Sequence, residues 1–296
     1  MTAPAPTRAT DAAGLALLLA TTIGWGLNWP AMKLLLAELP VFTTRAASGL
    51  LGFLLLAAVA LVLRESLAVP HRLWPRLLLA SGLNVTAWMG LASFSLLWLT
   101  AAEATIVCYT MPVWAVLMAW AILGERPGAL RVAGLVLALA GLSVLVFGKG
   151  VALGLEKAPG VGFGLASAIL FSLGTVVTKR WPLGLPPTAA TVWQVGLGIL
   201  PLAVAAMLFD PPALGALSPP GWALIAYGGV FALGLCYLSW FAALRRLPAS
   251  LASLGTLVTP VVGVASAAAF LGEPFGWREA ASLGLTLSGV AMAMRG

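Results

Sequence analysis

The chain has 296 residues, of which 61% are hydrophobic and 8% charged, and its mean hydropathy is +1.04. Soluble domains carry about 25% charged residues, and disordered chains are poor in apolar ones, so both classes are excluded. The net charge of +7 comes from basic residues that stand singly or in pairs between apolar runs, which gives no surface for a nucleic acid.

Apolar runs separated by charged residues or by Pro and Gly fill the chain from residue 12 to its end. A run of about 20 mostly apolar residues crosses a bilayer as a helix. The sequence therefore predicts an all-α integral membrane protein with ten transmembrane helices. Their predicted ranges are 12–35, 41–63, 74–98, 102–123, 130–148, 160–181, 188–209, 221–244, 248–271 and 278–295.

The Lys and Arg residues between these ranges indicate an orientation. With a cytoplasmic N-terminus, eleven of them lie on the cytoplasmic side and five on the other, and the positive-inside rule then places both termini in the cytoplasm. The eleven are Arg8, Arg64, Arg72, Arg76, Arg126, Arg131, Lys179, Arg180, Arg245, Arg246 and Arg295. The five are Lys33, Arg45, Lys149, Lys157 and Arg278.

An internal repeat appears when the chain is shifted by 148 residues. The stretch from Pro112-Val113 to Leu123-Gly124-Glu125 recurs from Pro260-Val261 to Leu271-Gly272-Glu273. Residues 1–148 and 149–296 each hold five predicted helices, and an odd number inserts the two units in opposite orientations. The sequence thus predicts a 5+5 inverted-topology repeat around a central cavity, an arrangement typical of alternating-access transporters.

The pattern also resembles a known family over essentially the whole chain, the EamA-type members of the drug/metabolite transporter superfamily. The residues that carry the resemblance are Trp25-Gly26, Lys33, Arg45, the hairpins from Pro112 to Glu125 and from Pro260 to Glu273, and the Gly-rich final segment. The resemblance implies export of small metabolites, mostly amino acids, across the bacterial cytoplasmic (inner) membrane. Aromatic amino acid exporters of the YddG kind are the expected subgroup. The alternatives are a lipid or lipid-linked sugar flippase and a multidrug or quaternary-cation exporter of the same fold.

Polar and aromatic side chains inside membrane helices are costly and usually face the bundle interior. We therefore predict that the substrate contacts Trp25, Asn28, Asn84, Trp88, Tyr109, Trp114, Thr175, Tyr237, Trp240 and Thr256. The alternative for the amides is a hydrogen bond between helices, and for the hydroxyls a bond to their own helix backbone. The ranges 130–148 and 278–295 carry almost nothing polar. Their glycines suit close packing, and the resemblance places both helices away from the cavity.

Two prolines and three charged residues are further candidates. Pro112 and Pro260 are expected to kink their helices and are hinge candidates, with a packing kink as the alternative. Lys33, Arg45 and Glu103 lie at a similar level near one membrane face. They are candidates for a gate, with an interfacial ion pair as the alternative.

Two glutamates close corresponding hairpins. Glu125 and Glu273 are expected to end their helices and to pair with Arg126, Arg131 or Arg278. No Asp, Glu or His lies at the centre of a predicted helix, which favours facilitated export down a gradient, with proton coupling through Glu103 as the alternative.

Enzymatic function is not expected. The chain holds one His, and it lacks paired-Asp motifs, a Gly-x-Ser-x-Gly elbow and a phosphate-binding glycine loop. We therefore predict no metal site and no cofactor. The expected partners are a small-molecule substrate and the lipid bilayer, with the monomer as the functional unit.

Overall fold

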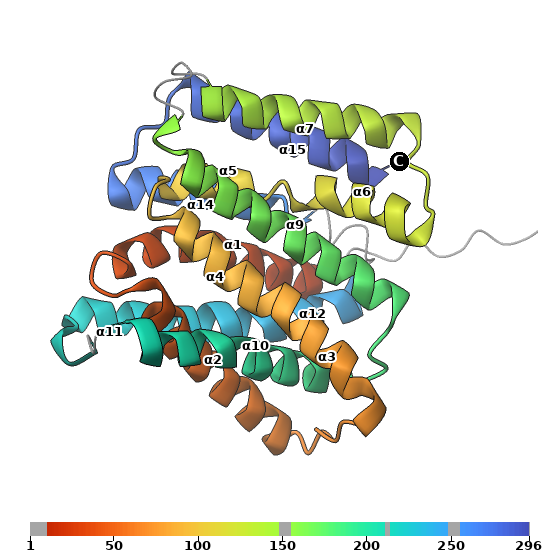
Figure 1. Cartoon of the computed structure of the whole chain (residues 1–296), viewed down its shortest axis with the longest axis vertical. Helices are drawn as coiled ribbons and strands as arrows, with labels where there is room; N and C mark the ends of the chain where they lie inside the picture. The colour runs from red at the N-terminus through yellow and green to blue at the C-terminus, as the bar shows by residue number, and fades with distance from the viewer. Residues whose placement is uncertain (1–10, 148–154, 211–213, 248–254, 296) are drawn as a thin grey trace, which may run out of the picture.

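The computed structural model describes residues 11–147, 155–210, 214–247 and 255–295, and all regular secondary structure in these ranges is helical. Figure 1 shows the arrangement of the helices. The first part of the chain forms α1 (Ala12–Leu35), α2 (Val41–Val62), η1 (His71–Leu73), α3 (Trp74–Ser81), η2 (Gly82–Ala87), α4 (Trp88–Ser95), α5 (Ala101–Cys108), α6 (Met111–Leu123) and α7 (Ala129–Phe147). The second part forms α9 (Ala158–Arg180), α10 (Pro187–Phe209), η3 (Leu214–Ala216), α11 (Pro219–Ala226), η4 (Tyr227–Leu235), α12 (Cys236–Arg246), α14 (Val258–Leu271) and α15 (Trp277–Arg295).

Helix is present in each of the ten predicted ranges, although the start of the ninth range, residues 248–254, lies outside the described residues. Arg8, Lys149 and the side chain of Arg295, which enter the charge count, also lie outside them. By length and composition, seven described segments can cross a membrane, and α7 and α14 add shorter apolar helices. The chain is therefore a multi-pass membrane protein. The seven segments are Ala12–Leu35, Val41–Val62, His71–Ser95, Ala101–Leu123, Ala158–Arg180, Pro187–Phe209 and Pro219–Arg246.

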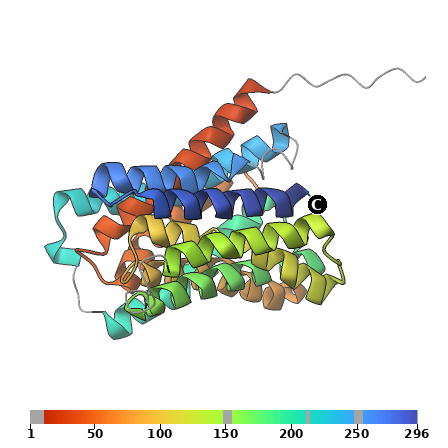
Figure 2. The ribbon, with the colours of Figure 1, turned by 90° about the horizontal axis from the view of Figure 1, so that it is seen from above.

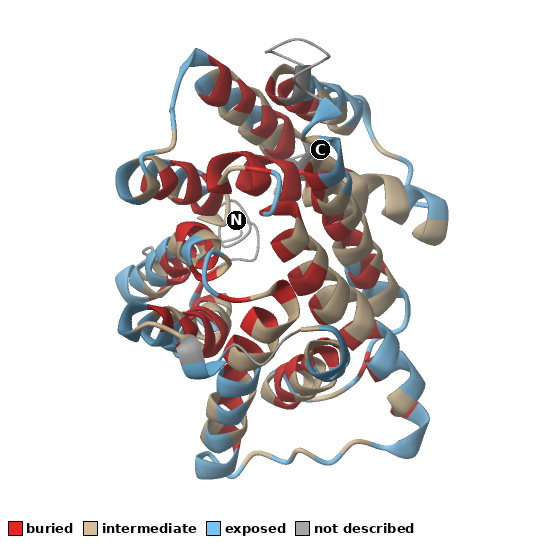
Figure 3. Ribbon diagram, turned by 60° about the vertical axis from the view of Figure 1, so that its left-hand side comes forward, coloured by how far each residue is buried: buried red, intermediate tan, exposed pale blue. Residues whose placement is uncertain are grey.

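The burial of side chains is also that of a membrane-embedded helical bundle. Buried residues gather on the helix faces that point into the bundle, and exposed residues concentrate at helix ends and loops (Figure 3). Large apolar side chains nevertheless lie on the outside, such as Val62 at 81% exposure and Met207 at 86%. An apolar outer surface of this kind matches a lipid environment, where apolar side chains face the hydrocarbon.

Helix ends follow from local sequence. Asp11 caps α1 by accepting hydrogen bonds from the backbone N–H groups of Gly14 and Ala13, and these bonds lower the pKa of its carboxyl group. The helices α6 and α14 both end in a left-handed residue, Gly124 (φ 73°) and Gly272 (φ 63°). Glycine adopts this conformation without a steric penalty, so the repeated Leu-Gly-Glu motif marks two equivalent helix ends.

Several membrane segments are irregular near their middle. The fourth segment breaks between Cys108 and Met111, just before Pro112, and α14 begins at Val258, two residues before Pro260. The third and eighth segments contain the π-helical turns η2 and η4, which the sequence analysis did not predict. π-Helical turns in α-helices are frequent at functional sites.

The helices α7 and α15 lie side by side in both views (Figure 1 and Figure 2). Their backbones are close enough that a Cβ atom on Gly289 would lie 2.5 Å from the Ala138 nitrogen. Ser282 Oγ donates a hydrogen bond of 2.7 Å to the Gly141 carbonyl across the same contact. The expected close packing of these two helices is confirmed.

The remaining helices pack around α1 and α9. The helix α1 packs against α14 and α12, while α9 packs against α6 and α4. The helices α2 and α10 pack against each other, α2 also against η4, and α10 also against α3 and η2. This arrangement leaves an interior space between α1, α4, α9 and α12.

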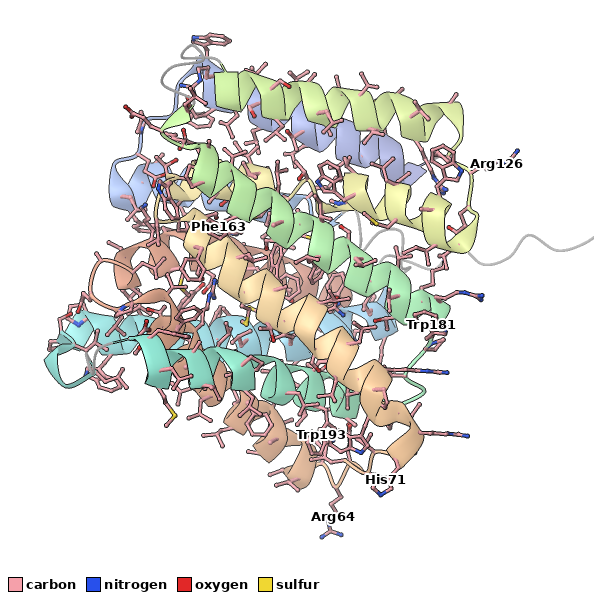
Figure 4. The ribbon with its side chains drawn as sticks, viewed as in Figure 1. Arg64, His71, Arg126, Phe163, Trp181 and Trp193 are labelled. Carbon is pink, nitrogen blue, oxygen red and sulfur yellow. The ribbon has the colours of Figure 1, made fainter. Side chains whose placement is uncertain are left out.

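We name the two ends of the bundle by their glutamates. The Glu103 end holds Lys33, Glu103 and Glu273, and the Glu125 end holds Glu125 and Arg246. Arg64 and Arg126, both predicted to lie on the cytoplasmic side, point away from the helices at the periphery of the molecule, as does His71 (Figure 4).

Candidate functional site

A cavity of about 370 Å³ lies in the interior of the bundle, within the size range of small-molecule sites. It is lined by residues from most of the membrane segments, and neither α7 nor α15 contributes to it. The predicted residues on its lining are Trp25, Asn28, Asn84, Trp88, Tyr109, Tyr237, Trp240 and Thr256, with the hinge candidate Pro112 and the gate candidate Arg45.

The cavity also has lining residues that the sequence analysis did not select as substrate contacts. Trp29 follows Trp25 by one helical turn, and this spacing was the one available signal. The others are apolar, and a residue facing lipid is equally apolar, so the sequence does not separate the two. They are Met32, Val85, Met89, Ala92, Met111, Phe171, Val195, Gly228, Ala232, Leu233 and Leu257.

Aromatic rings form the walls of the cavity. The Trp25 ring lies 5.4 Å from Tyr237, edge-on, and 5.9 Å from Trp240, centroid to centroid. Trp88 packs against Phe171 at 5.0 Å. Edge-on and tilted ring pairs of this kind are favourable arrangements of aromatic side chains, and all five rings line the cavity.

The π-helical turn η4 fixes the position of one of these rings. Trp25 Nε1 donates a hydrogen bond of 3.0 Å to the carbonyl of Ala232, which lies inside η4. Tyr227, the first residue of η4, donates from its hydroxyl to the Gly24 carbonyl at 2.7 Å. Two polar contacts therefore join α1 to η4, and no feature of the sequence predicted either of them.

The two amides on the lining differ in their bonding. Asn84 Nδ2 donates to Gln194 Oε1 at 3.2 Å, so Asn84 joins η2 to α10 while it lines the cavity. Asn28 makes no hydrogen bond with any described residue. Its amide is therefore available to a ligand, whereas the amide of Asn84 is partly occupied by the protein.

Arg45 lies one turn into α2, with 8% of its surface exposed. Its Nε donates to the Ser93 hydroxyl, and no carboxylate of the described residues forms an ion pair with it. Its guanidinium is thus a buried cation on the cavity lining with one neutral partner.

Three other predicted residues lie away from the cavity lining. Trp114 Nε1 donates to Thr110 Oγ1 at 3.1 Å, and Thr175 Oγ1 donates to the Phe171 carbonyl one turn before it at 3.0 Å. The latter is the alternative weighed for single hydroxyls in membrane helices. Pro260 is buried in α14 and does not line the cavity.

The gate candidates Lys33 and Glu103 are also outside the lining. Lys33 Nζ donates to the carbonyls of Leu96 and Leu99, the latter at 2.9 Å. These carbonyls follow the C-terminus of α4, where a positive charge is favourable because it faces the negative end of the helix dipole. Glu103 forms a capping box at the start of α5 and an ion pair of 2.6 Å with Lys157. The ion pair at this level of the bundle joins Glu103 to Lys157, and neither Lys33 nor Arg45 takes part in it.

The two repeated glutamates have partners that were not predicted. Glu273 accepts hydrogen bonds from the backbone N–H groups of Ala101 at 2.7 Å and Ala102 at 3.0 Å, at the N-terminus of α5. Glu125 pairs with Lys179 at 2.7 Å. The prediction that the adjacent arginines pair with these carboxylates was wrong, because each carboxylate reaches a different helix.

Over the described residues, no three His, Cys, Asp or Glu side chains come together as a metal site would require. The fold and the cavity define a class: multi-pass helical membrane proteins with an interior small-molecule site.

Comparison with known proteins identifies the family. The sequence model of the EamA-like transporter family matches the chain twice, at residues 12–147 and 158–295. The chain belongs to the EamA-like transporter family, and it is a membrane transporter.

Relatives agree with this assignment. The chain is 30% identical to the transporter YvbV of Bacillus subtilis, with 94% of this chain and 90% of YvbV covered. It is 26% identical to a probable amino-acid metabolite efflux pump of Salmonella typhimurium, with 95% of this chain and 92% of the pump covered. These relatives are named as transporters or pumps, which is consistent with a function other than enzymatic.

A solved crystal structure has the same fold. It covers 93% of this chain and 98% of its own, with a TM-score of 0.67 and 23% sequence identity. At this identity the match establishes the fold alone.

Proposed function

We propose that the protein is a secondary transporter that exports small metabolites, foremost amino acids including aromatic ones, by alternating access. The observation that carries the proposal is the cavity of about 370 Å³ walled by Trp25, Trp88, Tyr237 and Trp240. Rings of this kind accept an aromatic side chain, and the unpaired Asn28 amide offers hydrogen bonds to a polar group. The Salmonella relative named as a probable amino-acid metabolite efflux pump supports the same substrate class.

The pairing of helices supports an inverted repeat of residues 1–148 and 149–296. A shift of 148 residues relates α1 to α9, α4 to α12 and α6 to α14. The contact of α1 with α14 then corresponds to that of α9 with α6, and the contact of α1 with α12 to that of α9 with α4. The two matches of the family model divide the chain in the same way. Two such units can exchange conformations and open the cavity to either side in turn.

The ion pairs and capping bonds favour a state closed at the Glu103 end. There, Glu103 is 7% exposed in its ion pair with Lys157, and Glu273 binds the start of α5. At the Glu125 end, the Lys179–Glu125 pair has side-chain exposures of 64% and 42%. The buried ion pair and hydrogen bonds at the Glu103 end hold the helices together more strongly than the solvated pair at the Glu125 end. We therefore infer that this state opens toward the Glu125 end.

Orientation and energy source complete the proposal. The excess of Lys and Arg supports an orientation with both termini and the Glu125 end in the cytoplasm, for a protein of the bacterial cytoplasmic membrane. No Asp, Glu or His is among the described residues of the lining, which supports facilitated export over proton coupling, and the monomer is the functional unit in this proposal. Cysteines placed singly at Arg64 and Ser218 test the orientation: an impermeant maleimide should label Ser218→Cys alone in intact cells.

Counterflow in proteoliposomes tests the substrate class. Separate batches of liposomes are loaded with unlabelled Phe, Thr, Lys or a quaternary ammonium compound, and empty liposomes are the control. We expect the liposomes loaded with Phe to accumulate labelled Phe from outside. Counterflow of the quaternary ammonium alone would favour a cation exporter. Movement of a fluorescent lipid without any amino-acid counterflow would favour a flippase.

A further inference from the structure

Arg45 is the one charged side chain among the described residues that line the cavity. The lining otherwise consists of aromatic and apolar side chains, with the amides of Asn28 and Asn84 and the hydroxyls of Tyr109, Tyr237 and Thr256 as its further polar side chains. A buried cation without an anionic partner is unfavourable in a protein interior, and more so inside a membrane. Its presence on a cavity wall therefore calls for an anionic ligand.

The Arg45 guanidinium has N–H donors that make no hydrogen bond with the described residues. Arginine carries five N–H donors, and within the described residues Arg45 uses Nε alone, in its hydrogen bond to Ser93 Oγ. The two terminal nitrogens remain, in the fork arrangement that binds a carboxylate through two parallel hydrogen bonds. The hydrogen bond from Nε to Ser93 orients the guanidinium, and the neutral hydroxyl does not compensate its charge.

The position of Arg45 defines the orientation of a ligand. It lies near the start of α2, at the Glu103 end of the bundle, where Met32 and Ala92 line the cavity close to the ends of α1 and α4. The rings of Trp25 and Trp240 line the cavity further toward the Glu125 end. A ligand would thus direct its anionic group to the Glu103 end and its apolar body between the rings.

We propose that the site recognises organic monocarboxylates with an apolar or aromatic body, with the carboxylate bound by Arg45. This proposal rests on the proposed transport function and adds the chemistry that selects the substrate. The described lining offers no Asp or Glu to a ligand ammonium, so an ammonium group adds little to binding. A cation without a carboxylate is repelled by the guanidinium.

Three probes with one phenyl ring separate these contributions. L-Phenylalanine carries a carboxylate and an ammonium, 3-phenylpropanoate a carboxylate alone, and 2-phenylethylamine an ammonium alone. Their binding to the purified full chain in detergent at pH 7.5 is measured by isothermal titration calorimetry, which avoids the membrane permeability of the uncharged acid. We expect 3-phenylpropanoate to bind at least as tightly as phenylalanine, and both to bind at least about tenfold more tightly than 2-phenylethylamine.

Two variants locate the effect at Arg45. Arg45→Gln should weaken both carboxylates by about 10- to 100-fold and leave 2-phenylethylamine unchanged or bound more tightly, since a charge-assisted bidentate contact is lost. Arg45→Lys should keep part of the affinity for carboxylates, because it keeps the charge and loses the fork. Size-exclusion chromatography checks the fold of each variant, and the wild-type comparison of the three probes decides the proposal even if both variants misfold.

The outcomes separate the anion site from the transport function. Equal or tighter binding of 2-phenylethylamine by the wild type, or equal weakening of all three probes by a folded Arg45→Gln, overturns the anion site. Phenylalanine counterflow would in that case leave the proposed function standing. Tight binding of 3-phenylpropanoate without counterflow of any amino acid would support the anion site and remove amino acids as the substrate.

Discussion

Replacing Glu273 by Gln should loosen the Glu103 end of the bundle. The Glu273 carboxylate accepts two hydrogen bonds, from the N–H groups of Ala101 and Ala102, and thereby ties the end of α14 to the N-terminus of α5. Both alanines are buried, with 0% and 3% exposure, so water does not readily replace the lost partner. Gln keeps the shape of the side chain but offers one acceptor oxygen, and its NH₂ group cannot accept from the second N–H.

The magnitude follows from these contacts. Losing one hydrogen bond to a charged group costs about 1.5–3 kcal/mol, and removing a negative charge from a helix N-terminus costs about 0.3–1 kcal/mol. We therefore expect Glu273→Gln to destabilise the described state by about 2–4 kcal/mol. Glu125→Gln is the matched control, because Glu125 is the repeat equivalent and its pair with Lys179 is solvated. Exposed pairs contribute about 0–1 kcal/mol.

Thermal unfolding in detergent and hydrogen exchange provide the measurements. At about 2–4 °C per kcal/mol for a chain of roughly this size, Glu273→Gln should lower Tm by at least about 4 °C and Glu125→Gln by much less. Amide exchange at the start of α5 should accelerate in Glu273→Gln alone. Equal shifts in the two variants, or unchanged exchange at Ala101 and Ala102, would show that the carboxylate does not hold this end.

Three further predictions follow from the remaining contacts. Glu103→Gln should retain counterflow, because Gln keeps the capping box, its amide oxygen can still accept a hydrogen bond from Lys157 Nζ in place of the ion pair, and the residue lies off the cavity lining; complete loss of flux in a folded variant would contradict this. Trp88→Ala and Asn84→Ala should each reduce flux in proteoliposomes, and unchanged kinetics in both would assign the two residues to packing. Gly289→Ala should cost about 1–3 kcal/mol of stability and lower Tm, because its Cβ would lie 2.5 Å from backbone atoms of α7. The control Gly284→Ala, on the same helix with open space around it, should not; similar Tm values would refute the close contact.

The local features of the fold could be predicted because they depend on neighbouring residues. The apolar runs gave the helical ranges to within a few residues, and the repeated Leu-Gly-Glu motif marked the ends at Gly124 and Gly272. The spacing of aromatic and amide residues also found most of the polar lining. The π-helical turns were not predicted, because the small and apolar residues of Gly82–Ala87 and Tyr227–Leu235 fit the apolar pattern of an α-helix equally well.

The sequence by itself thus determined the class of protein and the helix ranges, since membrane insertion depends on the length and apolarity of each single segment. The tertiary structure alone decided which side chains meet. Glu273 reaches Ala101 across 172 residues, and Trp25 reaches a carbonyl across 207. It also decided that Arg45 lies buried on the cavity wall with a neutral partner. The apolar residues of the lining cannot be told from lipid-facing residues in the sequence, so for them only the packing of the helices separates the binding site from the membrane surface.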